Sequence, residues 1–193
     1  MVVKSAVILC GGKGTRLGAL GKRIPKPLIK IHGYPIIWYI INILKQNSFN
    51  HFILPIGHKG NLIEKYFKKN SIFKKYNIEI IKTGQKTSIA ERIYRIRKKI
   101  RSKNFILLNG DAIFDFDLKK ILNNHEKKKF NITFIGCSAQ LNFGIVRKLD
   151  NKVVGFERDV EFNSIKKKDK KNFTGYVYSG ISILNSKLLK VNF

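Results

Sequence analysis

Cysteine is scarce in this chain, with only Cys10 and Cys137 among 193 residues. The two lie far apart in the sequence and have no metal-ligand spacing, which argues against a cysteine-based metal site. Each ends an apolar, strand-like run. We therefore expect both cysteines to be small buried residues.

Long apolar runs are also missing. The longest, residues 36–44, is too short to span a bilayer. Residues 1–4 lead directly into the first strand-like run, and no signal-peptide pattern precedes it. We therefore expect a cytoplasmic protein without a membrane partner.

Acidic residues are few, since 12 Asp and Glu stand against 39 Lys and Arg, which gives a formal net charge of +27. Such an excess is one feature of nucleic-acid-binding proteins. However, the cations are spread along the whole chain, and no helix-turn-helix or RNA-binding motif is visible. Lys, Asn, Ile and Phe are all abundant and have A/T-rich codons, so compositional bias is the simpler explanation. The positive field would concentrate anionic nucleotides and phosphorylated substrates.

The most informative segment is an apolar run, residues 6–10, that stops at Gly11 and Gly12, with Gly14 soon after. Branched apolar residues ended by glycines predict a buried strand and a loop. Such glycines let backbone N–H groups surround a polyanion, because no Cβ keeps the ligand away. Arg16 and Lys26 supply two cations near this loop. The alternative is a plain glycine-rich turn beside surface cations.

Two well-known phosphate-binding loops do not match this segment. A P-loop requires a glycine five positions before its Gly-Lys pair, where this chain has Val7. The dinucleotide fingerprint, laid on Gly12 and Gly14, requires a third glycine where Leu17 stands. The loop belongs to neither class.

Strand-like and helix-like runs alternate along the chain. The predicted strands are residues 6–10, 51–56, 78–81 and 103–108, and the predicted helices are residues 35–44, 61–69, 89–100 and 118–126. This alternation predicts an α/β fold with a largely parallel sheet covered by helices on both faces. Shorter strands are predicted at residues 132–136, 144–147, 153–156 and 177–184, and the basic run 166–171 is predicted to be an exposed loop.

Asp111 follows the fourth predicted strand directly, in the sequence Asn109-Gly110-Asp111. Ligands of parallel sheets bind beyond the carboxyl ends of the strands, so Asp111 and the glycine loop are expected to converge on one crevice. A carboxylate there suits Mg²⁺, which takes one or two carboxylates together with phosphate oxygens. The alternative is a plain turn aspartate. Asp115 and Asp117 are expected to cap and open the next helix.

Nucleophilic or metal catalysis by histidine is not indicated. His32, His51, His58 and His125 have no mutual metal-ligand spacing, and we recognise no Ser-His-Asp or Cys-His arrangement. Each histidine is interpreted as structural or exposed.

Two spaced motifs resemble the sugar-phosphate nucleotidyltransferase family. Residues 11–17 are similar to the family signature G-G-x-G-T-R-L, and residues 25–28 match its P-K-P-L element. Residues 36–40, residues 57–67 and the pair Gly110-Asp111 extend the resemblance, which covers residues 4–185. Residues 82–95 are similar to the segment D-T-G-x-x-T-x-x-G-G-R-x-x-R of the cytidylyltransferases that act on glucose 1-phosphate.

The resemblance implies a Rossmann-like, mostly parallel sheet flanked by helices, in a single domain of residues 1–193. Residues 1–130 would be the nucleotide-binding part, and residues 131–193 a partial acceptor-binding part with short strands. The implied reaction transfers NMP, here CMP, from a nucleoside triphosphate to a sugar 1-phosphate, giving an NDP-sugar and pyrophosphate. The phosphate monoester is largely dianionic near neutrality and needs no general base. Catalysis would then rest on alignment and on neutralisation of like charges.

Carried over residue by residue, the resemblance also implies a site. The catalytic residues would be Arg16, Lys26 and Asp111, with Asp111 on Mg²⁺. The nucleotide would be bound by Leu9, Cys10, Gly11, Gly12, Lys13, Gly14, Thr15, Arg16, Lys26, Thr87, Arg92 and Gly110. The acceptor would be bound by Gly144, Glu157, Arg158 and Gly180.

The chain departs from the family pattern in three places. Ala90 and Glu91 replace a Gly-Gly pair, which puts a carboxylate where the family's backbone approaches the nucleotide. Arg158 replaces a lysine and presents a planar fork. The family's second magnesium aspartate lies in a segment beyond Phe193. Three hypotheses stay open: an enzyme, a truncated or inactive nucleotide-binding relative with a regulatory role, and a nucleic-acid-associated protein. Homo-oligomerisation is open as well.

Overall fold

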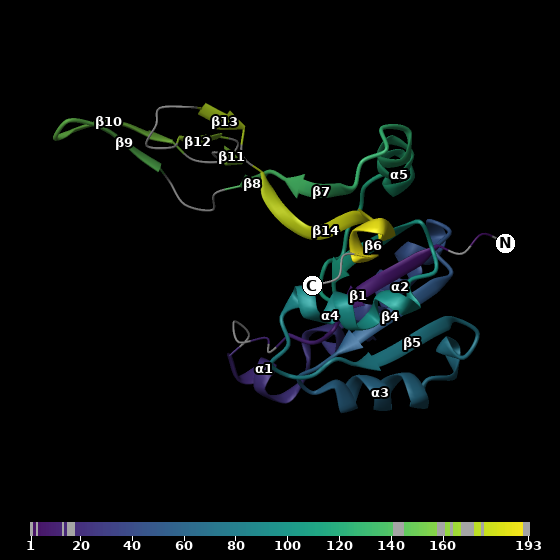
Figure 1. The fold of residues 1–193 in the computed structure, drawn as a ribbon. Helices are drawn as coiled ribbons and strands as arrows, with labels where there is room; N and C mark the ends of the chain where they lie inside the picture. Colours follow the sequence, from purple (N-terminus) through teal and green to yellow (C-terminus); the bar gives the residue numbers. More distant parts are fainter. Residues whose placement is uncertain are drawn as a thin grey trace. The chain divides into compact units, whose positions relative to one another are not determined.

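The computed structural model describes residues 2, 4–12, 14, 18–140, 145–157, 161–162, 164–166, 172–174 and 176–190. The chain forms two compact units, the first from residues 1–133 and 180–193 and the second from residues 134–179. Figure 1 shows the elements in chain order. The sequence predicted that a nucleotide-binding part ends at residue 130 and that the rest of the chain forms one further part. In the structure the segment from Gly180 onward belongs to the first unit.

The main sheet is mixed and has the strand order β5-β4-β1-β6-β14-β7, and its strands β7 and β14 each have residues in both units. Its strands are β1 (Ser5–Leu9), β4 (His51–Ile56), β5 (Asn77–Lys82), β6 (Asn104–Asn109), β7 (Ile132–Cys137) and β14 (Val177–Asn185). The neighbours β5, β4, β1 and β6 run parallel, and β14 joins β6 antiparallel. The predicted α/β fold with a largely parallel, Rossmann-like sheet is therefore confirmed.

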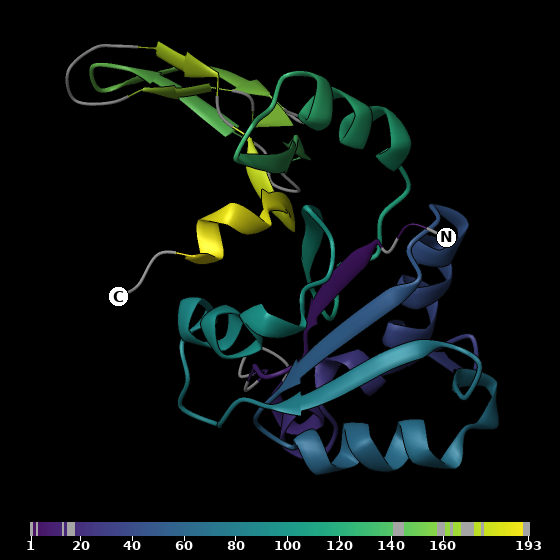
Figure 2. The same cartoon turned by 45° about the vertical axis from the view of Figure 1, so that its right-hand side comes forward.

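Helices cover both faces of this sheet. The main helices are α2 (Ile36–Gln46), α3 (Gly60–Lys69), α4 (Ile89–Ile96) and α5 (Leu118–Lys127). Crossovers between parallel strands follow a right-handed rule, which places α2 and α3 on one face and α4, on the return from β5 to β6, on the other. Figures 1 and 2 show α2 and α4 on opposite sides of the sheet. Across the described part of the chain, no helix combines the length and apolar character needed to cross a bilayer.

Shorter elements complete the first unit. They are α1 (Gly18–Arg23), the strands β2 (Lys30–Ile31) and β3 (Tyr34–Pro35), and the 3-10 turns η2 (Lys26–Leu28), η3 (Ser71–Phe73), η4 (Arg97–Lys99) and η5 (Ser186–Lys190). As predicted, Asp117 caps α5, because its side chain accepts a hydrogen bond from the Lys120 N–H. The structure shows no capping bond from Asp115 among the contacts it describes.

The helix at residues 89–100 needs a correction. Ile93 and Ile96 are buried against Val7 and Ile53, as the apolar stripe predicts. Ile89, at the first turn, is 58% exposed instead of lying in the core. The α-helix ends at Ile96 and tightens into η4. A helical stripe alone cannot show where a helix passes the edge of the sheet it covers.

A polar cluster lies at the amino-terminal edge of the sheet. Ser5 Oγ is 3.0 Å from His51 Nδ1, and His51 Nε2 is 3.0 Å from Glu79 Oε1. The Glu79 carboxylate also pairs with Lys99 and Arg101. Burial would raise the pKa of Glu79, but hydrogen bonds from His51 and Lys99 outweigh burial and lower it. Ser5 and His51 are fully buried, so this Ser-His-Glu arrangement, which the sequence interpretation did not foresee, is structural.

The second unit consists of short antiparallel pairs. These are β9 (Ile145–Leu149) with β10 (Lys152–Glu157), β8 (Ala139–Gln140) with β11 (Glu161–Phe162), and β12 (Ser164–Lys166) with β13 (Asn172–Thr174). Of the predicted loop 166–171, Lys166 ends β12, and residues 167–171 lie outside the described residues.

Cys137 corrects a second expectation. Cys10 is buried as predicted, whereas Cys137, at the end of β7, is exposed. In β7 only Ile135 is buried, and the apolar Ile132 and Phe134 are exposed as Cys137 is. An apolar run therefore does not guarantee burial in a thin antiparallel unit.

Candidate active site

The sheet order places a crevice between two particular strands. The chain proceeds outward from β1 through β4 to β5 and then crosses to β6 on the other side of β1. At such a reversal the loops after the two central strands separate and leave room for a ligand. Gly11 follows β1 and Asp111 follows β6. The two segments predicted to converge therefore flank the same switch point.

A cavity of about 570 Å³ lies at this point. Its walls come from the glycine loop, η2, the segment before α4, the first turns of α4 and the end of β6. The lining residues are Leu9, Cys10, Gly11, Gly12, Gly14, Lys26, Pro27, Gln85, Lys86, Thr87, Ile89, Arg92, Asn109, Gly110 and Asp111.

Lys26 and Asp111 meet inside this cavity. Lys26 Nζ donates to Asp111 Oδ2 at 2.8 Å, and the two side chains are 30% and 34% exposed. The buried Pro27 holds η2 close to the end of β6, because a Cβ on Gly110 would lie 2.7 Å from Pro27 Cγ. Gly110 N–H also donates to the Leu9 carbonyl. The backbone around both groups is therefore tightly placed, while the ion pair itself stays open to solvent.

The paired glycines have different neighbours. A Cβ on Gly11 would lie 2.2 Å from Arg92 Nη1, so Gly11 makes room for another part of the protein. A Cβ on Gly12 would meet nothing within 4 Å. The sequence analysis explained both glycines by the close approach of a ligand. Of this pair, only Gly12 fits that explanation.

Arg92 is buried, with 5% of the residue exposed. Its guanidinium donates to Thr83 Oγ1 at 2.6 Å and to the carbonyls of Ile56 and Gly11 at 3.3 Å. Burial lowers the pKa of Arg92, and the nearby Arg95 lowers it further, against the opposing effect of Glu91. Arg92 lines the cavity. The hydrogen bonds of its guanidinium go to protein groups at or just after the ends of β5, β4 and β1.

The sequence of this site matches a known family. Residues 5–192 fit the family model described as nucleotidyl transferase. The chain belongs to the nucleotidyl transferase family. It is 32% identical over 179 residues to the probable glucose-1-phosphate cytidylyltransferase of Bacillus subtilis, covering 83% of this chain and 70% of that protein. It is 38% identical over 124 residues to the D-glycero-alpha-D-manno-heptose 1-phosphate guanylyltransferase of Campylobacter jejuni, covering 63% of this chain and 54% of that protein.

The fold agrees with this family assignment. The crystal structure of HddC from Yersinia pseudotuberculosis in complex with GMP-PN superposes with a TM-score of 0.69 at 24% identity, over 98% of this chain and 80% of that one. At this identity the likeness concerns the fold.

Most residues that the resemblance assigned to the nucleotide line the one cavity. Lys13, Thr15 and Arg16 lie outside the described residues. Pro27, Gln85, Lys86, Ile89 and Asn109 also line the cavity and were not assigned. Each of them is close in the sequence to an assigned residue. Only this closeness could have indicated, from the sequence, that they line the cavity.

The structure describes both residues of the Ala90-Glu91 departure, which lie in the first turn of α4. Neither residue lines the cavity, and the Glu91 carboxylate accepts from Arg95 Nη2 at 2.5 Å, one helical turn along α4. The carboxylate is therefore held on the helix surface. The effect of this carboxylate on nucleotide binding and base choice stays a prediction.

Thr83 was missed as a site residue. It is fully buried and donates to the Ile56 carbonyl while accepting from Arg92. Thr87 Oγ donates to the Thr83 carbonyl at 2.5 Å, so the assigned Thr87 is tied to the same segment. Thr83 matches the threonine of the family's D-T-G pattern, and this match could have identified it from the sequence.

The acceptor residues are not brought together among the described residues. Gly144 and Arg158 lie outside them, and Glu157 is described only as the last residue of β10. Gly180 belongs to the first unit, has a positive φ of 82°, and packs on Asn109, where a Cβ would lie 2.7 Å from Nδ2. The acceptor assignments stay predictions.

The site offers one carboxylate to a metal ion. Within the described ranges there is no group of three or more His, Cys, Asp and Glu that could enclose one. Asp111 is part-exposed in the cavity, which fits an ion that takes one protein carboxylate and completes its shell with phosphate oxygens. Beside it, burial of Cys10 and the Asp111 charge both raise the pKa of the Cys10 thiol, which disfavours a thiolate ligand there.

Proposed function

We propose that this chain transfers CMP from CTP to a sugar 1-phosphate, giving a CDP-sugar and pyrophosphate. The observation that carries the proposal is the single cavity that brings a glycine loop, Lys26 and Asp111 together at the switch point of the sheet. Family membership and the relatives named as sugar 1-phosphate nucleotidyltransferases support the reaction class.

The cavity suits attack by one phosphate on another. The acceptor phosphate is dianionic near neutrality, so the site needs cations and alignment more than a general base. Lys26 would neutralise charge on the triphosphate, and the open backbone at Gly12 would admit a phosphate oxygen. Asp111 would hold Mg²⁺, which when bound neutralises phosphate charge.

Cytidine is the base we favour, because the Bacillus subtilis relative named as a probable glucose-1-phosphate cytidylyltransferase matches over 83% of this chain at 32% identity. The Campylobacter jejuni guanylyltransferase matches at higher identity over a shorter stretch, so GTP is the second candidate. The base would lie against the wall of Gln85, Lys86 and Ile89. A thermal-shift panel of CTP, GTP, UTP and ATP ranks these candidates, because a bound ligand stabilises the folded state.

The deciding experiment is pyrophosphate release from CTP and glucose 1-phosphate with Mg²⁺. Release that depends on both substrates and on Mg²⁺ is expected. Release with GTP and a heptose 1-phosphate alone would replace cytidine by guanine and keep the reaction class. Nucleotide binding with no product from any acceptor would favour the regulatory relative. Salt-sensitive binding to arbitrary DNA or RNA without nucleotide affinity would favour the nucleic-acid hypothesis.

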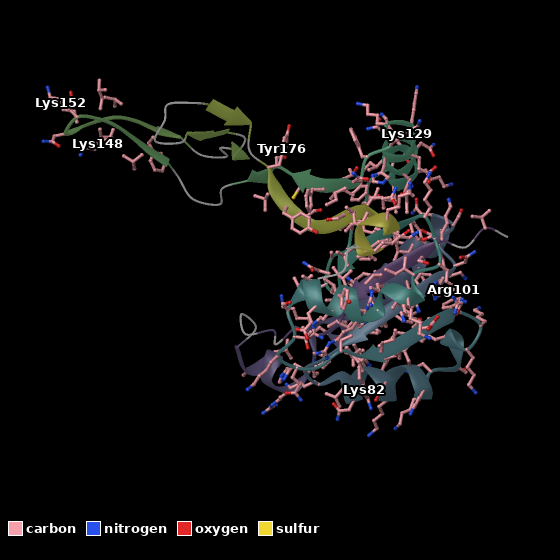
Figure 3. The ribbon with its side chains drawn as sticks, in the orientation of Figure 1. Lys82, Arg101, Lys129, Lys148, Lys152 and Tyr176 are labelled. Atoms are coloured by element: carbon pink, nitrogen blue, oxygen red, sulfur yellow. The ribbon has the colours of Figure 1, made fainter. Side chains whose placement is uncertain are left out.

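The distribution of cations is relevant to that last outcome. Figure 3 shows Lys82, Arg101 and Lys129 on separate parts of the first unit. These three cations belong to different elements: Lys82 ends β5, Arg101 precedes β6, and Lys129 follows α5.

A further inference from the structure

Arg92 is a buried cation directly behind the glycine loop. Its three acceptors are the Thr83 hydroxyl, the Ile56 carbonyl and the Gly11 carbonyl. All three are neutral, so none of them forms an ion pair with the guanidinium. They also belong to the ends of three different strands or loops, β5, β4 and β1.

We propose that Arg92 is a positioning residue that turns the Gly11–Gly12 peptide so that the Gly12 N–H faces the phosphate. The inference rests on the proposed function, because it assumes that a triphosphate occupies the cavity. Arg92 itself need not touch the nucleotide to do this.

Peptide geometry supplies the argument. In a planar trans peptide the C=O and the following N–H point in opposite directions. The Gly11 carbonyl accepts from Arg92 Nη2 at 3.3 Å and from the His58 N–H at 3.4 Å, so it points into the protein. The Gly12 N–H of the same peptide therefore points away from Arg92. Gly12 lines the cavity, and a Cβ added to it would meet nothing within 4 Å, so a ligand can approach this residue.

Two glycines make room for the guanidinium. A Cβ on Gly11 would lie 2.2 Å from Arg92 Nη1, and a Cβ on Gly57 would lie 2.7 Å from both Nη atoms. Neither glycine has a positive φ. The buried arginine explains the missing side chain at Gly11, whereas at Gly57 the Gly84 carbonyl, 2.5 Å from the Cβ position, excludes a side chain as well.

Lysine could not replace Arg92 in this role. The guanidinium is a planar fork that reaches Thr83 with one arm and Gly11 with the other, whereas an ammonium is a single point on a flexible stem. Arg92→Lys keeps the positive charge but cannot bond the Thr83 hydroxyl and the Gly11 carbonyl at the same time. This substitution separates orientation of the peptide from a general positive field.

The experiment compares binding of a triphosphate with binding of its nucleoside. Isothermal titration measures the affinities of wild type, Arg92→Lys and Arg101→Lys for the triphosphate that wild type prefers and for the matching nucleoside. We expect Arg92→Lys to weaken triphosphate binding about 10- to 100-fold and nucleoside binding less than 3-fold. Arg101→Lys is the matched control, since Arg101 bonds Glu79 at the other edge of the sheet, and it should change neither affinity.

The outcomes are distinguishable. If wild type binds no triphosphate, the proposed function fails. If wild type binds and Arg92→Lys binds equally well, or loses nucleoside and triphosphate affinity in equal measure, the positioning role is overturned. Should Arg92→Lys fail to fold, Thr83→Val removes one acceptor of the fork with little change in shape, and it is expected to weaken triphosphate binding selectively by about 3- to 10-fold.

Discussion

Lys26 and Asp111 neutralise each other across 2.8 Å in the cavity, although 84 residues separate them in the chain. Each has a separate expected task, one on the triphosphate and one on a metal ion. An arriving nucleotide with its metal ion would therefore exchange this ion pair for two new ones. The pair is about one-third exposed, so its contribution to folding stability is small.

Replacing Lys26 tests this arrangement. Lys26→Met is expected to lower the rate of pyrophosphate release about 10²- to 10³-fold, because one preorganised cation is lost from the transition state. The melting temperature should change little. Lys119→Met, at an exposed position on α5, is the control and should leave the rate unchanged. A Lys26→Met protein that turns over at the wild-type rate contradicts the assignment.

The two adjacent glycines should respond in opposite ways to a methyl group. Gly11→Ala is expected to destabilise the fold by about 1–3 kcal/mol, because its Cβ would overlap the Arg92 guanidinium. Gly12→Ala should unfold within about 0.5 kcal/mol of wild type and yet bind triphosphate about 10-fold more weakly. Denaturant unfolding and isothermal titration measure the two effects. Equal destabilisation by both changes would contradict the geometry.

Glu91 should not select the base. Its carboxylate is bound by Arg95 on the surface of α4, so Glu91→Gln is expected to leave the ratio of CTP to GTP affinity within about 2-fold. Ile89→Ala is the companion change, because Ile89 lines the cavity while 58% exposed. It should weaken nucleotide binding severalfold. A base preference that follows Glu91 rather than Ile89 would be inconsistent with this placement.

The Glu79 cluster predicts a dependence of stability on pH. The pKa of Glu79 is lowered in the folded state from its ordinary value of 4.5. The carboxylate therefore stabilises the fold above about pH 4.5, and this contribution is lost as the pH falls through the lower folded value. Glu79→Gln should reduce the unfolding free energy by about 1–3 kcal/mol at pH 7 and by much less at pH 3. Denaturant titrations at the two pH values check this, and an equal loss at both would rule out the ionised carboxylate as the cause.

The two thiols should differ in reactivity. Cys10 is buried with a raised pKa, and Cys137 is exposed. Because the thiolate is the reactive form, a chromogenic disulfide reagent should titrate one thiol in the native protein and two after denaturation. Cys137→Ser should leave none that reacts rapidly in the native state. Rapid native reaction of that variant would show that Cys10 is accessible.

Buried strands and the switch point were predictable because both leave strong local signals. The strand at β4 reads as continuous apolar sequence, and all six of its residues are buried. Asp111 could be placed at a strand end by its position directly after such a run. These inferences need only the chain's local pattern and the rule that parallel strands end at one edge.

The direction of individual side chains was not predictable in this way. The spacing around Arg92 says nothing about whether its guanidinium turns to a ligand or to Thr83. Cys137 and Ile89 look like core residues in the sequence, and their exposure depends on which layers cover them. The Ser5–His51 contact joins the first residues of two strands and has no short-range signal at all.

The chain leaves the first unit after Thr133 and re-enters it at Gly180, on strands β7 and β14 that are neighbours in the sheet. Segments whose entry and exit adjoin are readily exchanged, because the flanking chain keeps its course. The described residues that line the cavity fall between Leu9 and Asp111, in the first unit. We therefore expect that residues 134–179 can be exchanged as a block while the described residues that line the cavity stay unchanged.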